Sequence, residues 1–395
     1  MTEIRPAHDR DDAAATTADT TLKGAGVTAP RVVVAGGHSA GHIEPAMNFA
    51  DALRRLEPTA EITALGTVRG LDTTLIPARG YPLELIPPAP LPRGLSRTLL
   101  QTPGRLRDSV LAAGAVLDRV RAEVVVGFGG YAAAPAYLAA HRRGLPIVVH
   151  EANARPGLAN RLAARMTTHV FTAAPGVRLP HATAIGIPLR PAITGLDRAA
   201  LRDAARKWFG LRPDGPVLMV TGGSQGAEAI NSAVSGAAAA LRAAGVQVLH
   251  ITGPKHVVEV PDGDPADPPY VVIPYVEEMQ YAYAAADFVI CRSGAMTCAE
   301  LASAGLPAAY VPLPLRGGEQ RLNAEPAVAA GGALLVDNED LDPAWIETTL
   351  IPVLTDPARM AAMSARASTV GATDAGVVLA GHVLATVAER RKLAS

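Results

Sequence analysis

The feature that most constrains the fold of this chain is a strand, a glycine-rich turn and a helix that occur twice in the same order. The first copy begins with the β-branched run Arg31–Ala35, which stops at a Gly-Gly pair, and a helix with apolar residues on one face is expected over His42–Leu56. The second copy begins at Val217, about 185 residues later, and continues through the turn 222–226 into another helix. Two such units predict an α/β chain of two Rossmann-like, doubly wound domains.

Short apolar runs alternate with helical patterns through both halves of the chain, which is the order that parallel sheets require. They predict strands near 62–65, 124–126, 147–149 and 169–171 in the first half, and near 248–251, 270–273, 288–290 and 308–311 in the second. Pro188 and Pro191 lie where one half gives way to the other, and proline interrupts both helix and sheet. The expected ligand site is the cleft between the two domains.

The domain limits follow from these signals. We predict a disordered extension over 1–30, a first domain over 31–188 and a second domain over 189–372. The last segment, 373–395, is predicted as a helix with Asp374 as its capping residue, despite two internal glycines.

The composition narrows the class of protein. At 395 residues the chain is too long for one ordinary core, and a net charge of −1 gives no support for a nucleic-acid partner. Its two cysteines, Cys291 and Cys298, exclude a disulfide framework and have the wrong spacing for a zinc site, so a reducing compartment is expected. No apolar run reaches the roughly 18 residues that span a bilayer, and residues 1–30 contain no apolar segment typical of a secretory signal.

A glycine-rich turn between a strand and a helix can bind an anion, because its backbone N–H groups are accessible and the helix N-terminus is partially positive. The sequence disfavours the two commonest nucleotide sites of this kind. A Walker loop needs a lysine before Ser or Thr, which neither turn has. A dinucleotide fold needs an acidic residue at the end of its second strand, where this chain reads Leu65-Gly66-Thr67. ATP hydrolysis and NAD chemistry are therefore not expected.

A third anion site is expected at 291–300, where a strand ends in a Ser-Gly turn and a helix begins. Thr297 would add a hydroxyl to the free N–H groups of that helix, Glu300 would accept hydrogen bonds from a diol such as ribose, and Arg292 would face a phosphate or a base. The alternative is that Ser293 and Thr297 only cap the helix and that Glu300 is a surface residue. The spacing alone leaves both interpretations open.

Seven motifs follow one another between Val32 and Val336. They are GGHSAGHIEP (36–45), GFGGYAAAP (127–135), HEANARPGLAN (150–160), GIPLR (186–190), GGSQGAEAIN (222–231), CRSGAMTCAE (291–300) and GEQRLNA (318–324). In this order they resemble the MurG family, the glycosyltransferases of family 28. The resemblance implies a GT-B fold, in which two Rossmann-like domains face an interdomain cleft and the last helix returns to the first domain.

The resemblance implies an inverting, UDP-GlcNAc-dependent hexosyltransferase of peptidoglycan synthesis. Its donor would be UDP-N-acetylglucosamine, and its acceptor the C4 hydroxyl of N-acetylmuramic acid in lipid I, the precursor on undecaprenyl diphosphate that becomes lipid II. No cofactor and no metal are implied. The residues agree, because no Asp-x-Asp motif lies near the glycine turns and Asp262-Gly263-Asp264 lies in a Pro-rich loop. The helix that begins near Ala295 would stabilise the charge of the departing UDP.

Matched position by position, the resemblance implies a donor site held mostly by the second domain. Its members are Asn153, Arg190, Ser224, Gln225, Val276, Arg292, Met296, Thr297, Glu300, Gln320 and Asn323. Ser224 and Gln225 would lie near the phosphates, and the backbone of Val276 would hold uracil. Glu300 would bind the ribose hydroxyls, and Asn153 would reach the donor sugar from the first domain.

The resemblance places the acceptor on the first domain, around its glycine turn. The matched positions are Gly37, His38, Ser39, Ala40, Gly41, His42 and Tyr131. His42, with Ser39, is the catalytic candidate, because a histidine can deprotonate the attacking hydroxyl near neutral pH. The alternative, that His42 only binds the acceptor phosphate or caps the helix, stays open.

Four positions depart from the family pattern. Ser39 replaces a threonine and keeps the hydroxyl, while Ile187 and Glu319 stand where some members have Asn and Gln. His38 replaces a glycine of the first turn, and its Cβ restricts positive φ and would crowd the acceptor diphosphate. His38 is therefore the departure that bears on the choice of acceptor.

The lipid tail of such an acceptor implies a cytoplasmic protein in peripheral contact with the inner face of the cell membrane. The segment Leu91–Leu111 combines leucines with Arg93, Arg97, Arg105 and Arg107, and Arg142, Arg143, Arg161 and Arg165 add positive charge. Such a mixture fits an anionic membrane surface better than a span. The alternative is an amphipathic helix buried against the sheet, which explains the leucines but not the arginines. Proteins of cell-wall synthesis and division are a further partner class that the resemblance implies.

Two other functions stay open. A related transferase could use the same donor site on a water-soluble acceptor, as antibiotic-tailoring transferases do, and His38 together with the N-terminal extension motivates that hypothesis. A non-catalytic UDP-sugar-binding scaffold would bind the donor without releasing UDP in the presence of lipid I. Release of UDP that depends on a lipid I analogue would exclude the scaffold and favour the lipid I transferase.

Overall fold

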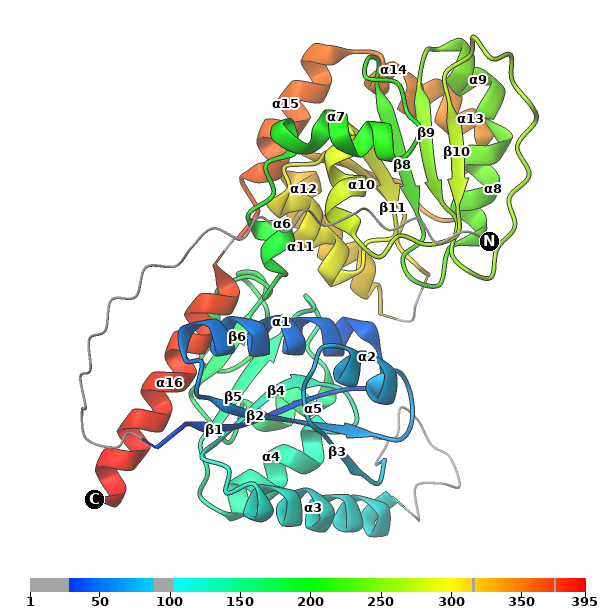
Figure 1. Cartoon of the computed structure of the whole chain (residues 1–395). Coiled ribbons are helices and arrows are strands. Elements are labelled where there is room, and N and C mark those ends of the chain that lie inside the picture. The colour runs from blue at the N-terminus through cyan, green and yellow to red at the C-terminus, as the bar shows by residue number, and fades with distance from the viewer. Residues whose placement is uncertain (1–27, 89–101, 315–316, 373) are drawn as a thin grey trace, which may run out of the picture.

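The chain forms two parallel sheets, each enclosed by helices (Figure 1). The structure is a computed structural model that describes residues 28–88, 102–314, 317–372 and 374–395. The first sheet has the order β3-β2-β1-β4-β5-β6-β7. Its strands are β1 (Arg31–Gly36), β2 (Glu61–Thr67), β3 (Leu83–Ile86), β4 (Val124–Gly129), β5 (Ile147–Glu151), β6 (Val170–Thr172) and β7 (Ala182–Ala184). Its helices are α1 (Ala40–Leu56), α2 (Asp72–Ala78), α3 (Thr102–Arg119), α4 (Ala133–Arg142) and α5 (Leu158–Ala163).

The second sheet has the order β10-β9-β8-β11-β12-β13. Its strands are β8 (Val217–Thr221), β9 (Gln247–Ile251), β10 (Tyr270–Ile273), β11 (Phe288–Cys291), β12 (Ala308–Tyr310) and β13 (Ala333–Leu335). Helices α6 (Pro191–Thr194), α7 (Arg198–Trp208), α8 (Glu228–Gly236), α9 (Ala238–Ala243), α10 (Met279–Ala285), α11 (Ala295–Ser303) and α12 (Glu319–Ala329) belong to this half. The chain ends with α13 (Pro343–Trp345), a π-helical turn (Ile346–Leu350), α14 (Ile351–Leu354), α15 (Pro357–Ser368) and α16 (Ala375–Ala394).

The central strands are buried on both faces, so their sequences are almost continuously apolar. In β1, Val33 and Ala35 pack with residues of α3 and α4, whereas Val32 and Val34 pack with residues of α1 and α16. Successive side chains of a strand point to opposite faces, which explains this division. The predicted motifs then lie in the loops at the carboxyl ends of the strands, where open α/β sheets bind their ligands.

The strands that the sequence predicted are present, and β4 and β5 extend past their apolar residues to Gly129 and Glu151. Three strands were not predicted, namely β3, β7 and β13. All three lie at sheet edges. Each is only three or four residues long, and all three residues of β7 are exposed. An edge strand of that kind has too few buried positions to leave an apolar run in the sequence.

The last helix, α16, lies against α1 of the first half (Figure 1). Its residues Leu379, Ala380 and Val383 belong to the same buried cluster as Val32 and Val34 of β1. Gly376 permits the close approach, because a Cβ at this position would lie 3.2 Å from the Cβ of Ala52. The predicted capping residue Asp374 stands at the N-cap, but its side chain makes no capping hydrogen bond to the described helix.

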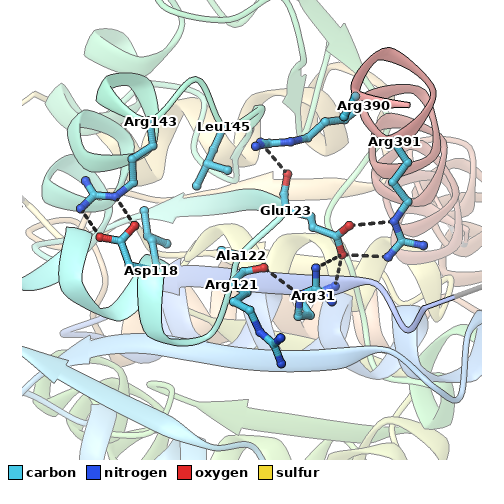
Figure 2. Close-up of a pocket in the computed structure, with 11 residues that line it drawn as sticks. Arg31, Asp118, Arg121, Ala122, Glu123, Arg143, Leu145, Arg390 and Arg391 are labelled. Carbon is cyan, nitrogen blue, oxygen red and sulfur yellow. Dashed lines mark hydrogen bonds and ion pairs between the residues drawn. The ribbon is translucent and has the colours of Figure 1, made fainter.

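An arginine cluster fastens the end of α16 to the first sheet (Figure 2). The Nε of Arg391 donates to Oε1 of Glu123 at 2.7 Å, and the backbone N–H of Arg31 donates to Oε2 at 3.0 Å. Arg390 donates to the backbone carbonyl of Glu123 at 3.3 Å. These groups line a cavity of about 550 Å³ together with Arg143, which pairs with a carboxylate of α3. Among the described residues, five arginines and two carboxylates line this cavity, and the partially negative carboxyl ends of α3, α4 and α16 offset part of the excess positive charge.

Several predictions fall partly outside the described residues. These are residues 1–27 of the extension and residues 91–101 of the proposed membrane segment. In the described part of that segment, Leu106 packs on the core of the first sheet, whereas Leu111 is 57% exposed on α3. None of the described helices is long and apolar enough to cross a bilayer. The domain limits at 188 and 372 stay a prediction.

Candidate functional site

The glycine turn of the first half is held by a buried carboxylate. Asp72, at the start of α2, is fully buried and accepts the backbone N–H of His38 at 2.6 Å and that of Thr67 at 2.8 Å. Gly37 packs directly on this carboxylate, because a Cβ there would lie 2.7 Å from Oδ2. Asp72 therefore ties the carboxyl ends of β1 and β2 together beneath the turn. Asp72 was not predicted as a site residue, since an aspartate at the start of a helix ordinarily signals only the helix end.

His38 adopts a left-handed backbone conformation, with φ of 80°. A side chain at this position was expected to disfavour positive φ. The turn nevertheless keeps the positive φ, so the backbone of His38 is strained. Its ring lies beside that of Tyr131, with the ring centroids 4.5 Å apart and the planes at 47°. The structure thereby joins two of the predicted acceptor residues.

The second glycine turn of the first half, after β4, packs against His42 and against the first glycine turn. Gly129 and Gly130 both have positive φ. A Cβ at Gly129 would lie 3.1 Å from Cε1 of His42, and one at Gly130 would lie 2.3 Å from the carbonyl oxygen of Gly37. The half-buried ring of His42 is therefore enclosed between the two turns, at the first turn of α1. Ser39 is the N-cap of α1, and its exposed side chain makes no capping hydrogen bond to the described helix. Ala40 and Gly41 form the first residues of that helix.

The start of α11 presents free backbone N–H groups at the end of β11. Its N-cap is Gly294, so the alternative in which Ser293 and Thr297 cap this helix does not hold. Ser293 is fully buried, and its hydroxyl has no hydrogen-bond partner among the described residues. Arg292 is fixed by hydrogen bonds to the carbonyls of Val311 and Pro312, at 3.1 and 3.4 Å. Burial lowers the pKa of this guanidinium.

Glu300 lies one turn further along α11 and is buried, with 8% of its surface exposed, so it is not a surface residue. Tyr283 donates its hydroxyl to Oε2 of Glu300 at 2.7 Å. Burial raises the pKa of the Glu300 carboxyl, while the hydrogen bond from Tyr283 and the charge of Arg190 oppose that rise. Arg190, at the N-cap of α6, keeps its buried Nε without a hydrogen-bond partner among the described residues. The predicted ribose acid and the predicted arginine are therefore neighbours.

The loop after β5 crosses to the second half. The backbone N–H of Ala154 donates to Oδ1 of Asn323 on α12 at 3.0 Å, and Arg155 donates to the carbonyl of Gly317 at 3.2 Å. The loop is shaped by Glu151, which is 1% exposed and accepts the N–H groups of Asn153 at 3.0 Å and Gly157 at 2.9 Å. Two predicted donor residues, Asn153 in this loop and Asn323 on α12, thus lie on the two sides of the contact between the halves. Glu151 was not singled out from the sequence.

The remaining donor candidates lie at the carboxyl ends of the second sheet. Ser224 and Gln225 are exposed in the turn after β8, Val276 is 8% exposed after β10, and Met296 lies half-buried in the first turn of α11. Gln320 accepts the backbone N–H of Leu313 at 2.9 Å. No hydrogen bond or ion pair among the described residues joins Ser224 or Gln225 to the other candidates.

A cavity of about 800 Å³ lies between the first half and the helices α11 and α12. Arg155 and Asn323 line it, together with Cys298 and Ala299 of α11. Thr297 and Glu300 are absent from its described lining, so this cavity and the predicted ribose site lie on different flanks of α11. Of the predicted donor residues, Asn323 alone is among the described residues that line this cavity.

Comparison with known families and proteins agrees with this architecture. Residues 32–172 match the glycosyltransferase family 28 N-terminal domain, and residues 217–378 match the family 28 C-terminal domain. A relative from Streptomyces avermitilis is 55% identical over 91% of this chain and 99% of its own length. A relative from Thermobifida fusca is 56% identical over 90% of this chain and 94% of its own length. Both bear the name UDP-N-acetylglucosamine--N-acetylmuramyl-(pentapeptide) pyrophosphoryl-undecaprenol N-acetylglucosamine transferase.

Solved structures share the fold. The crystal structure of Acinetobacter baumannii MurG superposes with a TM-score of 0.74 at 24% identity, over 90% of this chain and 99% of that one. CalG4, the calicheamicin glycosyltransferase, gives a TM-score of 0.64 at 17% identity, over 91% and 99% of the two chains. The GT-B fold predicted from the motifs is confirmed. With both domain models matched over most of its length, the chain belongs to glycosyltransferase family 28.

Proposed function

We propose that this chain transfers N-acetylglucosamine from UDP-N-acetylglucosamine to the C4 hydroxyl of the N-acetylmuramyl residue of lipid I, with inversion at the anomeric carbon. The observation that carries the proposal is identity of 55% and 56%, over at least nine-tenths of the chain, to relatives named for this transfer. The product is lipid II, the precursor for peptidoglycan synthesis. The non-catalytic scaffold is disfavoured, because both of these relatives are named as transferases.

The donor binds at the carboxyl ends of the second sheet. The buried carboxylate of Glu300, already held by Tyr283, accepts the ribose hydroxyls, and Arg190 beside it faces the diphosphate. The free N–H groups at the start of α11 receive the phosphate oxygens. Asn323 and the loop of Asn153 enclose the sugar, since their contact at Ala154 already joins the two halves.

The transfer then needs a base and a stabilised leaving group. His42 takes the proton of the C4 hydroxyl as the hydroxyl oxygen forms its bond to the anomeric carbon. The bond from that carbon to the β-phosphate oxygen breaks, and UDP leaves with its negative charge facing the N-terminus of α11. No metal or cofactor takes part in these steps.

The test is UDP release in detergent micelles, with and without a short-chain lipid I analogue. We expect release that depends on the analogue, and its loss in Glu300→Ala. Glu347→Ala, which changes an exposed glutamate of the π-helical turn, is the matched control and should keep full activity. Donor binding without analogue-dependent release would refute the proposed acceptor. Turnover on a water-soluble acceptor would instead support the alternative of a related transferase that acts on a soluble acceptor.

The lipid acceptor also implies where the enzyme works. We place it in the cytoplasm, on the inner face of the cell membrane, with the leucine- and arginine-rich segment Leu91–Leu111 toward anionic lipid. The exposure of Leu111 supports this, because α3 offers an apolar side chain to its surroundings there. Sedimentation with phosphatidylglycerol vesicles should carry the protein down at low salt and release it at high salt. Equal sedimentation with neutral vesicles would contradict the anionic contact. Proteins of cell-wall synthesis and division stay a predicted partner class.

A further inference from the structure

His38 is held in a strained conformation in the acceptor turn. Only three non-glycine residues among those described have positive φ, and His38, at 80°, is the one with the largest value. A glycine would adopt this conformation without strain, whereas a side chain persists there only where its surroundings enforce it. Such positions concentrate at functional sites.

The surroundings fix the backbone of His38 on both sides. Its N–H donates to the buried carboxylate of Asp72 at 2.6 Å, and its carbonyl accepts the N–H of Leu71 at 3.3 Å. Gly70 packs on the same carbonyl, because a Cβ there would lie 2.3 Å from that oxygen. The peptide N–H of His38 is therefore committed to Asp72 and does not face a ligand in the turn.

The side chain, in contrast, is left with its polar atoms unused. His38 is exposed, and neither ring nitrogen makes a hydrogen bond in the part of the chain that the structure describes. The Tyr131 ring, 4.5 Å away, supports it from the second glycine turn. The result is an imidazole in a defined position beside the N-terminus of α1, where an anion is favoured.

We propose that His38 is a specificity-determining residue for the acceptor, and that its ring N–H donates a hydrogen bond to the acceptor's pyrophosphoryl group while Tyr131 supports the ring. The backbone N–H of His38 is used by Asp72 and cannot bind the acceptor, so the imidazole N–H takes its place as the hydrogen-bond donor. The inference rests on the proposed function, because it takes the acceptor to be a diphosphate.

The experiment compares full-length wild type with His38→Gly in steady-state kinetics on the lipid I analogue. The acceptor KM should rise about tenfold, as expected for a lost hydrogen bond to a charged group. The donor KM and kcat should change less than about twofold, since the base and the donor site are untouched. The melting temperature should be equal or higher, because glycine relieves the positive φ. His38→Asn, which tolerates this φ but has no imidazole, should show the same rise in KM.

The matched control is His181→Gly. His181 is also an exposed histidine with positive φ, at 60°, but it precedes the edge strand β7. This variant should gain stability without any change in the acceptor KM. A second comparison uses an acceptor analogue that lacks the diphosphate, on which wild type and His38→Gly should perform equally.

An unchanged acceptor KM in His38→Gly would overturn the inference, and so would an equal loss on the analogue without the diphosphate. Absence of analogue-dependent UDP release in wild type would instead overturn the proposed function itself, which keeps the two failures distinct.

Discussion

At the scale of single residues, the proposed role of His42 as general base can be tested directly by substitution. Its ring lies against Gly129, between the two glycine turns of the first half. If it is the general base, His42→Gln should lower kcat by about a hundredfold or more and leave the acceptor KM nearly unchanged. The rate of UDP formation, measured over a range of acceptor concentrations up to saturation, separates the two effects. A raised acceptor KM with unchanged kcat would mean that His42 only binds the acceptor phosphate.

Asp72 carries a prediction about stability at the same scale. Its carboxylate accepts two backbone N–H groups and the hydroxyl of Thr67, which lies 3.2 Å from Oδ2. Asp72→Asn replaces one of the two acceptor oxygens by an NH2 group, which faces an N–H donor and cannot accept from it. We therefore expect a loss of about 2–3 kcal/mol in the free energy of unfolding. Urea denaturation measures it. Asp340→Asn, at an exposed aspartate, should change little, and an equal loss in both variants would contradict the role given to Asp72.

Buried site residues differ in how far the sequence predicts them. Glu300 could be anticipated, because it stands at a fixed spacing within a specific motif and the structure then buries it beside Tyr283. Asp72 and Glu151 could not, because each serves backbone N–H groups whose neighbourhood is created only by the fold. A buried carboxylate with backbone partners leaves no periodic pattern in the sequence. The sequence predicted that a side chain at position 38 would strain a turn that needs positive φ. It did not predict the contact between the rings of His38 and Tyr131.

At the scale of elements, the attachment of α16 can be weakened by one substitution. Although burial opposes it, hydrogen bonds from Arg391 and Arg31 hold the pKa of Glu123 below its ordinary value. This contribution is present above the pKa of an unfolded glutamate and is lost as the pH falls through the lower folded value. Because the pair is partly exposed, Arg391→Ala should cost only about 1 kcal/mol near neutral pH.

The measurement for this variant is thermal unfolding near neutral pH and at about pH 3, where the difference from wild type should shrink. Lys392→Ala, at the next position of the same helix, is the control and should behave as wild type. A loss that is independent of pH would show that Arg391 acts through packing alone.

Strands are predicted well from the sequence where they are buried, as β1 and β8 are, and poorly where they are exposed at a sheet edge, as β7 is.

At the scale of the whole molecule, both halves should lose stability over the same range of acidic pH. Burial lowers the pKa of His150 in β5 and of His250 in β9 from 6.5 to about 4. The unfolded chain binds these protons first, so the stability that is present above pH 6.5 is lost as the pH falls toward 4. Down to about pH 5 the loss should reach up to about 2 kcal/mol for each histidine.

Urea denaturation at about pH 7.5 and about pH 5 tests this linkage. His250→Gln removes one titrating group, so the variant should be less sensitive to acid than wild type even where it is less stable overall. His181→Gln, at an exposed histidine, should keep the wild-type sensitivity. An unchanged acid sensitivity in His250→Gln would contradict the assignment.

The position of α16 also has a consequence for how the chain is made. Val32 and Val34 face a cluster that α16 completes, yet about 340 residues separate those valines from the helix. A ribosome releases the C-terminal residues last, so the first sheet is translated long before its final cover emerges. During that interval an apolar face of the sheet is open to other chains and to chaperones. Loss of only the last twenty residues would make this exposure permanent, so a truncated product should be recognised by quality control even though every other helix and strand of both halves has been synthesised.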